Sequence, residues 1–157
     1  MSQYAAPRNR CTTSGLLTAT GAETVHDTTV TIAFSVNGKA TTKTAITDGA
    51  TPTTDAVTGA AFEAFGPSEG CVFVWALTAG GTVKVAQGTV ESWDGTAFTV
   101  APKFPNVPDT MTPFAYQVVK ASSTASAWTI GTSNWNATGV TNAIVNVHEL
   151  PDRPQVA

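Results

Sequence analysis

The sequence predicts an all-β protein: an antiparallel β-sandwich or barrel-like domain with at most one short helix and with extended N- and C-terminal arms. Three observations predict it. Strand candidates recur every 8–15 residues with turn residues between them, a spacing typical of sandwiches and barrels. Threonine, alanine, glycine and valine dominate, and charged residues fill only 12% of the 157 positions, against about 25% in an ordinary soluble domain. Prolines stiffen both ends of the chain.

The clearest element lies between residues 29 and 46. A short strand is expected before it, around Leu16 and Leu17. Apolar residues then alternate with small or hydroxyl-bearing ones, which places one set on the core face of a strand; the apolar set is Val30, Ile32, Phe34 and Val36. Asn37-Gly38 follows and is typical of a two-residue hairpin turn. The returning strand, residues 39–46, is threonine-rich and carries two lysines, as expected of an exposed edge strand.

The middle of the chain predicts one helix and the most buried strand. Residues 53–65 predict a short helix, because Thr53-Thr54-Asp55 can cap it and because Val57, Ala61 and Phe65 recur at helical spacing. Residues 71–78 are apolar at successive positions, which predicts a central strand buried on both faces. Residues 82–88 predict the returning strand, and the turn at 93–95 precedes a further short strand over 96–100.

Proline governs the next segment. Residues 101–113 contain four prolines, and proline lacks the N–H that a sheet interior needs. An ordered loop that crosses the domain is therefore expected there, anchored by Phe104, Val107 and Met111. Strands are expected at 114–120, 127–132 and 140–148. The expected organisation is an N-terminal arm at 1–11, one β domain at 12–148 and a C-terminal arm at 149–157; simple terminal disorder is the alternative for both arms.

Charge and hydropathy argue against some partners. The formal net charge is −3 and the basic residues are scattered, whereas a general binder of nucleic acid or anionic membranes needs clustered lysine and arginine. The longest strongly apolar run, residues 72–77, is far shorter than the ~20 residues of a membrane span. Residues 1–8 lack a hydrophobic region, so no signal peptide is expected. We therefore expect the protein to be assembled in a cytoplasm.

The sequence predicts no catalytic, cofactor or metal site. Gly66-Pro67-Ser68-Glu69-Gly70 has the G-x-S-x-G form, but a nucleophile elbow needs a strand before the serine and a helix after it; a plain turn is expected. His26 and His148 each adjoin a carboxylate in the chain, and neighbouring strand residues point to opposite faces. Cys11 and Cys71 are expected as reduced, partly buried thiols, and a disulfide between them stays open.

The four tryptophans divide into two that are expected in the core and two that are expected at the surface. Trp75 lies in the most buried strand and Trp128 alternates with Ile130, so both are expected in the core. Trp93 and Trp135 lie in turn-like contexts and are expected at the surface. There they could face a sugar or a protein neighbour, and tryptophan is enriched at interface centres.

Residues 71–154 resemble the small virion structural proteins of tailed bacteriophages, most of all capsid decoration (cement) proteins. The resemblance lies in the residue style and in the order of these segments: Val72-Phe73-Val74-Trp75, Gly81-Thr82-Val83, Gln87-Gly88, Phe104-Pro105-Asn106-Val107-Pro108, Pro113-Phe114-Ala115-Tyr116-Gln117-Val118-Val119, Ser133-Asn134-Trp135 and Leu150-Pro151-Asp152-Arg153-Pro154.

The resemblance implies a non-enzymatic protein on the capsid surface of a virion. It would bind the phage major capsid protein, stabilise the head shell and associate with itself, as a trimer in the commonest arrangement of such proteins; nucleic acid and membranes are not expected partners. The candidate interface residues are Tyr4, Arg8, Arg10, Trp93, Phe104, Trp135, Leu150 and Arg153. The alternative is a carbohydrate-binding β-sandwich module of a phage fibre or tail adhesin, with an unrecognised hydrolase as a remote third.

Overall fold

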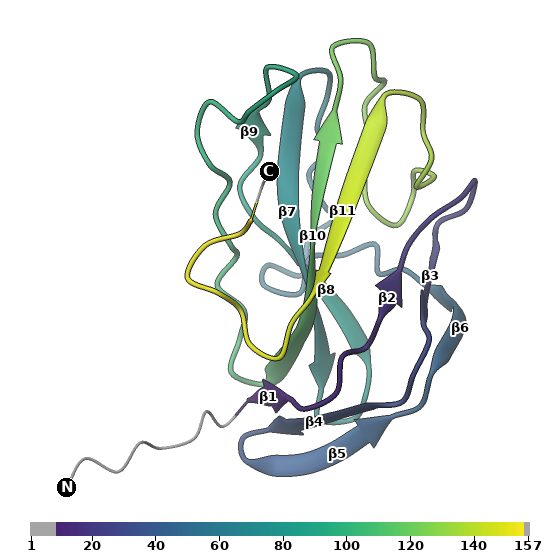
Figure 1. Cartoon of the computed structure of the whole chain (residues 1–157), viewed down its shortest axis with the longest axis vertical. Coiled ribbons are helices and arrows are strands. Elements are labelled where there is room, and N and C mark those ends of the chain that lie inside the picture. The colour runs from purple at the N-terminus through teal and green to yellow at the C-terminus, as the bar shows by residue number, and fades with distance from the viewer. Residues whose placement is uncertain (1–8, 156–157) are drawn as a thin grey trace, which may run out of the picture.

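The computed structural model describes residues 9–155, and these form an all-β fold, as predicted (Figure 1). The strands, in chain order, are β1 (Arg10–Cys11), β2 (Leu17–Thr18), β3 (Val25–Thr28), β4 (Ile32–Val36), β5 (Lys39–Lys43), β6 (Ile46–Ala50), β7 (Glu69–Thr78), β8 (Val83–Gln87), β9 (Glu91–Ser92), β10 (Met111–Ala121) and β11 (Val140–Asn146). No helix occurs between residues 9 and 155.

Three antiparallel sheets pack together, an arrangement consistent with a β-sandwich. The largest sheet has the order β11-β10-β7-β8, and β9 pairs with the start of β7. The two smaller sheets have the orders β1-β4-β5 and β2-β3-β6. In Figure 1 the large sheet stands upright, and the small sheets lie at its base and lower right.

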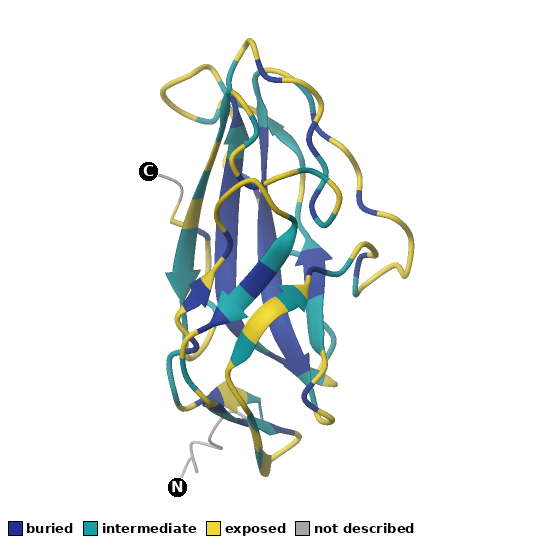
Figure 2. Cartoon of the chain, turned by 90° about the vertical axis from the view of Figure 1, so that its right-hand side faces the viewer, coloured by how far each residue is buried: buried dark blue, intermediate teal, exposed yellow. Residues whose placement is uncertain are grey.

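Strand β7 is the centre of the fold, as the apolar run at 71–78 predicts. It pairs with β10 on one side and β8 on the other. All its residues except the two terminal ones are buried, and Figure 2 shows this burial as dark blue along the long central strands. Alternate side chains enter two separate hydrophobic clusters, one on each face of the sheet.

The first cluster is the main core and is rich in aromatic rings. Trp128 lies at its middle, with ring centroids 5.5 Å from Phe65, 6.0 Å from Phe73 and 5.6 Å from Trp135. Trp75 joins it from β7, 6.3 Å from Trp135. Strands β2 and β4 add Leu17, Ile32, Phe34 and Val36. Trp75 and Trp128 are therefore core residues, as the sequence predicts.

The second cluster covers the opposite face of the large sheet. Its buried members are Val72, Val74, Tyr116 and Val118 from β7 and β10. No sheet covers this face; it is closed by partly buried side chains from irregular segments and from β11 and the chain after it: Phe98, Phe104, Val107, Val145, Val147 and Leu150. The proline-rich loop thus packs on Phe104 and Val107, two of its three predicted anchors; the third, Met111, is instead the first residue of β10.

The predicted hairpin forms. Asn37 and Gly38 have φ of 51° and 78°, the left-handed conformation that a tight hairpin turn requires, and Val36 pairs with Lys39. Strand β5 is an edge strand. The alternating run is interrupted, however: residues 29–31 separate β3 from β4, and the two strands belong to different small sheets.

The predicted helix over residues 53–65 is wrong. The Asp55 carboxylate accepts hydrogen bonds from the backbone N–H groups of Val57 (3.2 Å) and Thr58 (3.3 Å), which is the start of a turn as much as of a helix. Gly59 then adopts a φ of 73°, which ends any helical path. Isolated bridges replace the helix, pairing Thr54 with Ala61 and Phe65 with Trp128.

Three expected strands differ from the structure. At 127–132 only Trp128 pairs, with Phe65, because the chain turns at once: Ser133 N–H donates to the Thr129 carbonyl. At 96–100 a single bridge joins Phe98 to Trp93. Strand β10 starts three residues earlier than predicted and includes Pro113, which is tolerated where the register with β7 shifts.

Candidate functional site: the terminal segments

The N-terminal segment is fastened to the domain at Asn9. Its side-chain amide donates hydrogen bonds to the carbonyls of Asp109 (2.5 Å) and Met111 (3.0 Å), at the entry to β10. Its amide oxygen accepts a hydrogen bond from the Asn37 N–H (2.7 Å), at the β4–β5 turn. One side chain therefore ties the start of the described chain to two distant elements.

Arg10 and Cys11 continue this attachment as β1. They pair with Ser35 and Phe34 of β4, and Cys11 is fully buried. The expected N-terminal arm at 1–11 is thus too long: its last residues belong to a sheet. An isolated arginine and cysteine carry no strand periodicity, so the sequence gives no sign of β1.

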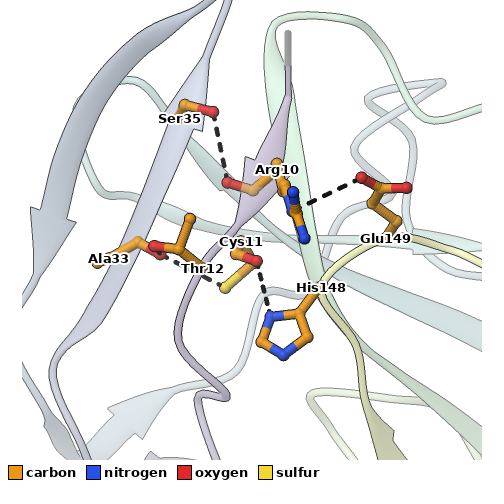
Figure 3. Close-up of polar contacts among 7 residues, drawn as sticks. All are labelled: Arg10, Cys11, Thr12, Ala33, Ser35, His148 and Glu149. Carbon is orange, nitrogen blue, oxygen red and sulfur yellow. Dashed lines mark hydrogen bonds and ion pairs between the residues drawn. The ribbon is translucent and has the colours of Figure 1, made fainter. Parts of the chain in front are cut away.

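The two ends of the domain meet beside β1 (Figure 3). The Cys11 N–H donates to the His148 carbonyl (3.1 Å), and His148 Nδ1 lies 2.8 Å from the Cys11 carbonyl oxygen. Because a carbonyl can only accept, Nδ1 carries the proton. Arg10 Nε lies 3.7 Å from a Glu149 carboxylate oxygen, and both side chains are about half exposed. Arg10 therefore has a partner within its own chain.

The C-terminal segment is extended but does not leave the domain, contrary to the expectation of a free arm. It turns back after β11 and runs up beside the large sheet (Figure 1). Leu150 packs against the second cluster, Pro154 is buried, and the Gln155 N–H donates to the Tyr116 hydroxyl (3.1 Å). Arg153 is exposed. A shallow hollow of about 340 Å³ lies between Tyr116, Leu150 and the end of β11.

Phe104 and Leu150 serve the same surface. The Phe104 ring lies edge-on to Tyr116 at 5.2 Å, a favourable geometry for aromatic rings. Both side chains are only partly buried. They therefore cover the second cluster from the proline-rich loop and from the C-terminal segment, and their outer sides remain at the surface.

The two tryptophans expected at the surface have different fates. Trp135 is only 2% exposed and its indole N–H donates to the Val25 carbonyl (2.7 Å), so its placement at an interface is wrong. Trp93 is partly exposed. Its ring packs against Phe98 at 5.2 Å, and the Lys120 ammonium lies 4.3 Å from its centroid.

The expected site residues do not form one cluster. Arg10, Phe104, Leu150 and Arg153 lie along the terminal segments and the surface they cover, Trp93 lies near β9, and Trp135 is in the core. Tyr4 and Arg8 lie outside the described residues. Sequence reasoning missed Asn9, Tyr116 and Glu149, since no local pattern links them to hydrogen-bond or ion-pair partners that lie 39 or more positions away in the chain.

The candidate chemistry elsewhere is consistent with structural roles. Ser68 has a φ of 59° and opens β7, and its backbone hydrogen-bonds Ser122 and Trp93. The His26 ring packs against Trp75, and its Nδ1 lies 3.4 Å from the Thr51 hydroxyl. Both thiols are free and buried; burial raises the pKa of Cys71 to about 12 and also raises that of Cys11. No group of three metal-ligating side chains occurs between residues 9 and 155.

A function for this chain has to be argued from its residues and their geometry, because the comparisons with known proteins found no match. No helix within the described part of the chain is both long and apolar enough to cross a membrane. No protein-family model, curated protein or solved structure matches this chain.

Proposed function

We propose that this chain is a non-enzymatic structural protein of a tailed-phage virion. It binds the major capsid protein on the capsid surface and stabilises the head shell as a decoration (cement) protein, after assembly in the host cytoplasm. It also associates with itself, and a trimer is the order that the resemblance implies. Neither nucleic acid nor a membrane is a partner in this proposal. The all-β fold and the resemblance of residues 71–154 support it.

The observation that carries the proposal is the attachment of the N-terminal segment. A terminal segment that holds a neighbouring subunit must itself be firmly attached to its own domain. Asn9 and β1 provide this: they are hydrogen-bonded to the entry of β10, to the β4–β5 turn, to β4 and to His148. Residues 1–8, with Tyr4 and Arg8, precede this anchor directly. We assign the contact with the capsid protein to them.

The surface supports the same proposal. Exposed positions of β5 carry Ala40 and Thr42 beside one charged residue, Lys39, and exposed positions of β11 carry Thr141 and Ala143. Uncharged side chains lose less hydration energy than charged ones when a partner covers them. A subunit that stays bound to its neighbours benefits from such a surface, whereas a freely diffusing protein is kept soluble by net charge.

Deletion of residues 1–8 tests the proposal. The deletion removes the proposed contact and keeps Asn9 and β1, so the fold and its unfolding midpoint stay unchanged. Binding to capsids that lack the protein falls at least about tenfold, as measured by co-sedimentation. Thr96→Ala is the control, because this exposed side chain is outside the deleted segment and is not a candidate interface residue. Full capsid occupancy by the deleted chain overturns the assignment, and failure of the intact chain to bind capsids overturns the function.

The carbohydrate-binding alternative depends on Trp93, since Trp135 is buried. Lys120 and Phe98 already contact the Trp93 ring, which leaves less of its surface for a sugar. A glycan array probed with the intact chain and with Trp93→Ala separates the two functions. Specific glycan binding that disappears in Trp93→Ala favours the adhesin, and no binding favours the structural protein.

A further inference from the structure

Strand β11 forms one edge of the large sheet, with β10 on its inner side. The ladder fixes which of its backbone groups face inward. The Val147 N–H donates to Phe114 and the Ser122 N–H donates to Gly139. Hydrogen-bonded pairs alternate along an antiparallel ladder, so Thr141, Ala143 and Val145 bond to β10. The N–H and C=O groups of the even-numbered residues face outward.

The outward groups at the centre of β11 have no partner in the described chain. No hydrogen bond between residues 9 and 155 engages the backbone of Asn142 or Ile144 on this side. At the ends of β11 the Val140 N–H donates to Ala137, and the Asn146 side chain accepts the Leu17 N–H. Unpaired backbone groups in a row are a template for another strand.

Two other edge strands, β5 and β8, are protected. Strand β5 carries Lys39 and Lys43, and lysine on an edge discourages pairing. The outer edge of β8 is covered, because Asp55 bridges to Val85 and the Ala56 N–H donates to the Val85 carbonyl. Strand β11, by contrast, contains neither a charged residue nor a proline over its seven positions.

We infer that β11 is a self-association surface, on which β11 of a second copy adds as an antiparallel strand. The two-fold axis passes through Ala143. Asn142 and Ile144 then exchange their outward hydrogen bonds across the axis, and Thr141 lies opposite Val145. A residue on a two-fold axis meets its own copy, so a charge at position 143 would face its like. The absence of charge in β11 makes the edge complementary to itself, and Ala143 is small and exposed.

This contact goes beyond capsid binding and does not require it. A two-fold contact joins two copies and closes there, so it cannot by itself form a three-fold ring. In the proposed function it would link copies that belong to neighbouring sites on the shell. Backbone hydrogen bonds would supply the affinity, as in other cases of strand addition.

Cysteine cross-linking tests the register. Residues opposite each other in a pair without hydrogen bonds have Cα atoms about 4.5 Å apart, within the range of a disulfide. Ala143→Cys should therefore form a covalent dimer under mild oxidation. Thr141→Cys is the matched control: it is equally exposed and on the same face, but two copies of residue 141 lie more than about 13 Å apart. The native thiols are buried. Equal cross-linking of both variants, or of neither, overturns the register.

A charge substitution tests the interface itself. Ala143→Lys opposes two like charges at the axis and should raise the dimer dissociation constant at least about tenfold, as measured by analytical ultracentrifugation. Thr42→Lys on the protected β5 edge should leave it unchanged. A wild-type chain that stays at 16.1 kDa at all concentrations, or an oligomer that Ala143→Lys does not affect, overturns the inference. Capsid binding of Ala143→Lys is measured alongside, so that loss of self-association and loss of the proposed function are distinguished.

Discussion

The two faces of the large sheet are covered in different ways. On one face, Phe73 and Trp75 of β7 pack against the aromatic residues of the main core and against two small sheets. On the other face, Val72 and Val74 of the same strand lie under irregular segments. One strand therefore serves both a core closed by hydrogen-bonded sheets and a core closed by a loop and the C-terminal segment.

The comparison teaches that burial and fastening are separate properties. Trp75 and Val74 are both fully buried, yet the elements above them differ in their ties to the rest of the fold. The strands of the small sheets are joined by backbone ladders, regular between β4 and β5 and with a register shift between β3 and β6, whereas the C-terminal segment is held by Leu150, Pro154 and the bond from Gln155 to Tyr116. We expect the second face to open first, because local stability follows such contacts.

The largest expected effect is in the main core. Trp128→Ala removes the ring that contacts Phe65, Phe73 and Trp135 and leaves a cavity, so the free energy of unfolding should fall by about 3–5 kcal/mol. Urea denaturation measures it. Trp93→Ala is the control for loss of an indole at the surface and should cost about 1 kcal/mol or less. Equal costs for the two variants would contradict the central place of Trp128.

Removal of the cover from the second face should have a smaller effect. Deletion of residues 150–157 removes Leu150 from the second cluster and Gln155 from the Tyr116 hydroxyl, and it should lower the free energy of unfolding by about 2 kcal/mol. Binding of a hydrophobic dye to the native state should rise. Arg153→Ala, which changes only an exposed side chain of that segment, should stay within about 0.5 kcal/mol of the wild type. Unchanged stability and dye binding after the deletion would show that the segment does not cover the sheet.

Acid should weaken the contact between β3 and β7 through His26. This ring is 3% exposed and lies 5.0 Å from Trp75. Burial lowers the pKa of His26 below its ordinary value of 6.5; Asp27 opposes this shift and Lys43 adds to it. The folded state then binds fewer protons than the unfolded state, so stability is present above pH 6.5 and is lost as the pH falls below it. Urea midpoints between pH 7.5 and 5.5 measure the loss, and His26→Gln should flatten it. A wild-type midpoint that does not fall over this interval would refute the prediction.

The smallest effect is expected where the two terminal segments meet. The ion pair between Arg10 and Glu149 is 3.7 Å long and half exposed, and such pairs contribute about 0–1 kcal/mol. Arg10→Ala should therefore barely change the unfolding midpoint, and a double-mutant cycle with Glu149→Ala isolates the pair. A coupling energy well above this range would mean that the junction is held by charge instead of by the backbone bonds of Cys11 and His148.

The sequence predicts elements whose signal is local. The turn at Asn37-Gly38 needs only the φ of two residues, and β7 needs only a continuous apolar run. The same reasoning fails at residues 53–65, where helical spacing competes with the Asp55 turn and with Gly59. It fails again at Trp135, because a turn-like neighbourhood does not reveal that the indole reaches Val25, 110 positions away.

Some features of the candidate surfaces could be predicted from the sequence, and others depend on the fold. The lack of charge in β11 can be read from the sequence, but that β11 is an edge while β10 is central follows from the order of strands in the sheet. The proline-rich cover was predictable as far as residue 110, because proline disfavours a sheet interior, but Pro113 lies inside β10. The return of the C-terminal segment onto Tyr116 was not predictable, since the bond from Gln155 to the Tyr116 hydroxyl and the packing of Leu150 decide it.

The sequence by itself determined the all-β class, the β4–β5 hairpin and the doubly buried central strand. These depend on backbone preferences and on the two-residue period of a strand, which act over a few neighbouring residues. Only the tertiary structure decided that residues 9–11 and 149–155 lie on the domain, that Trp135 is buried and that β11 is left with an open edge. Contacts between residues far apart in the chain decide these features, because they depend on which surfaces remain after the sheets have paired.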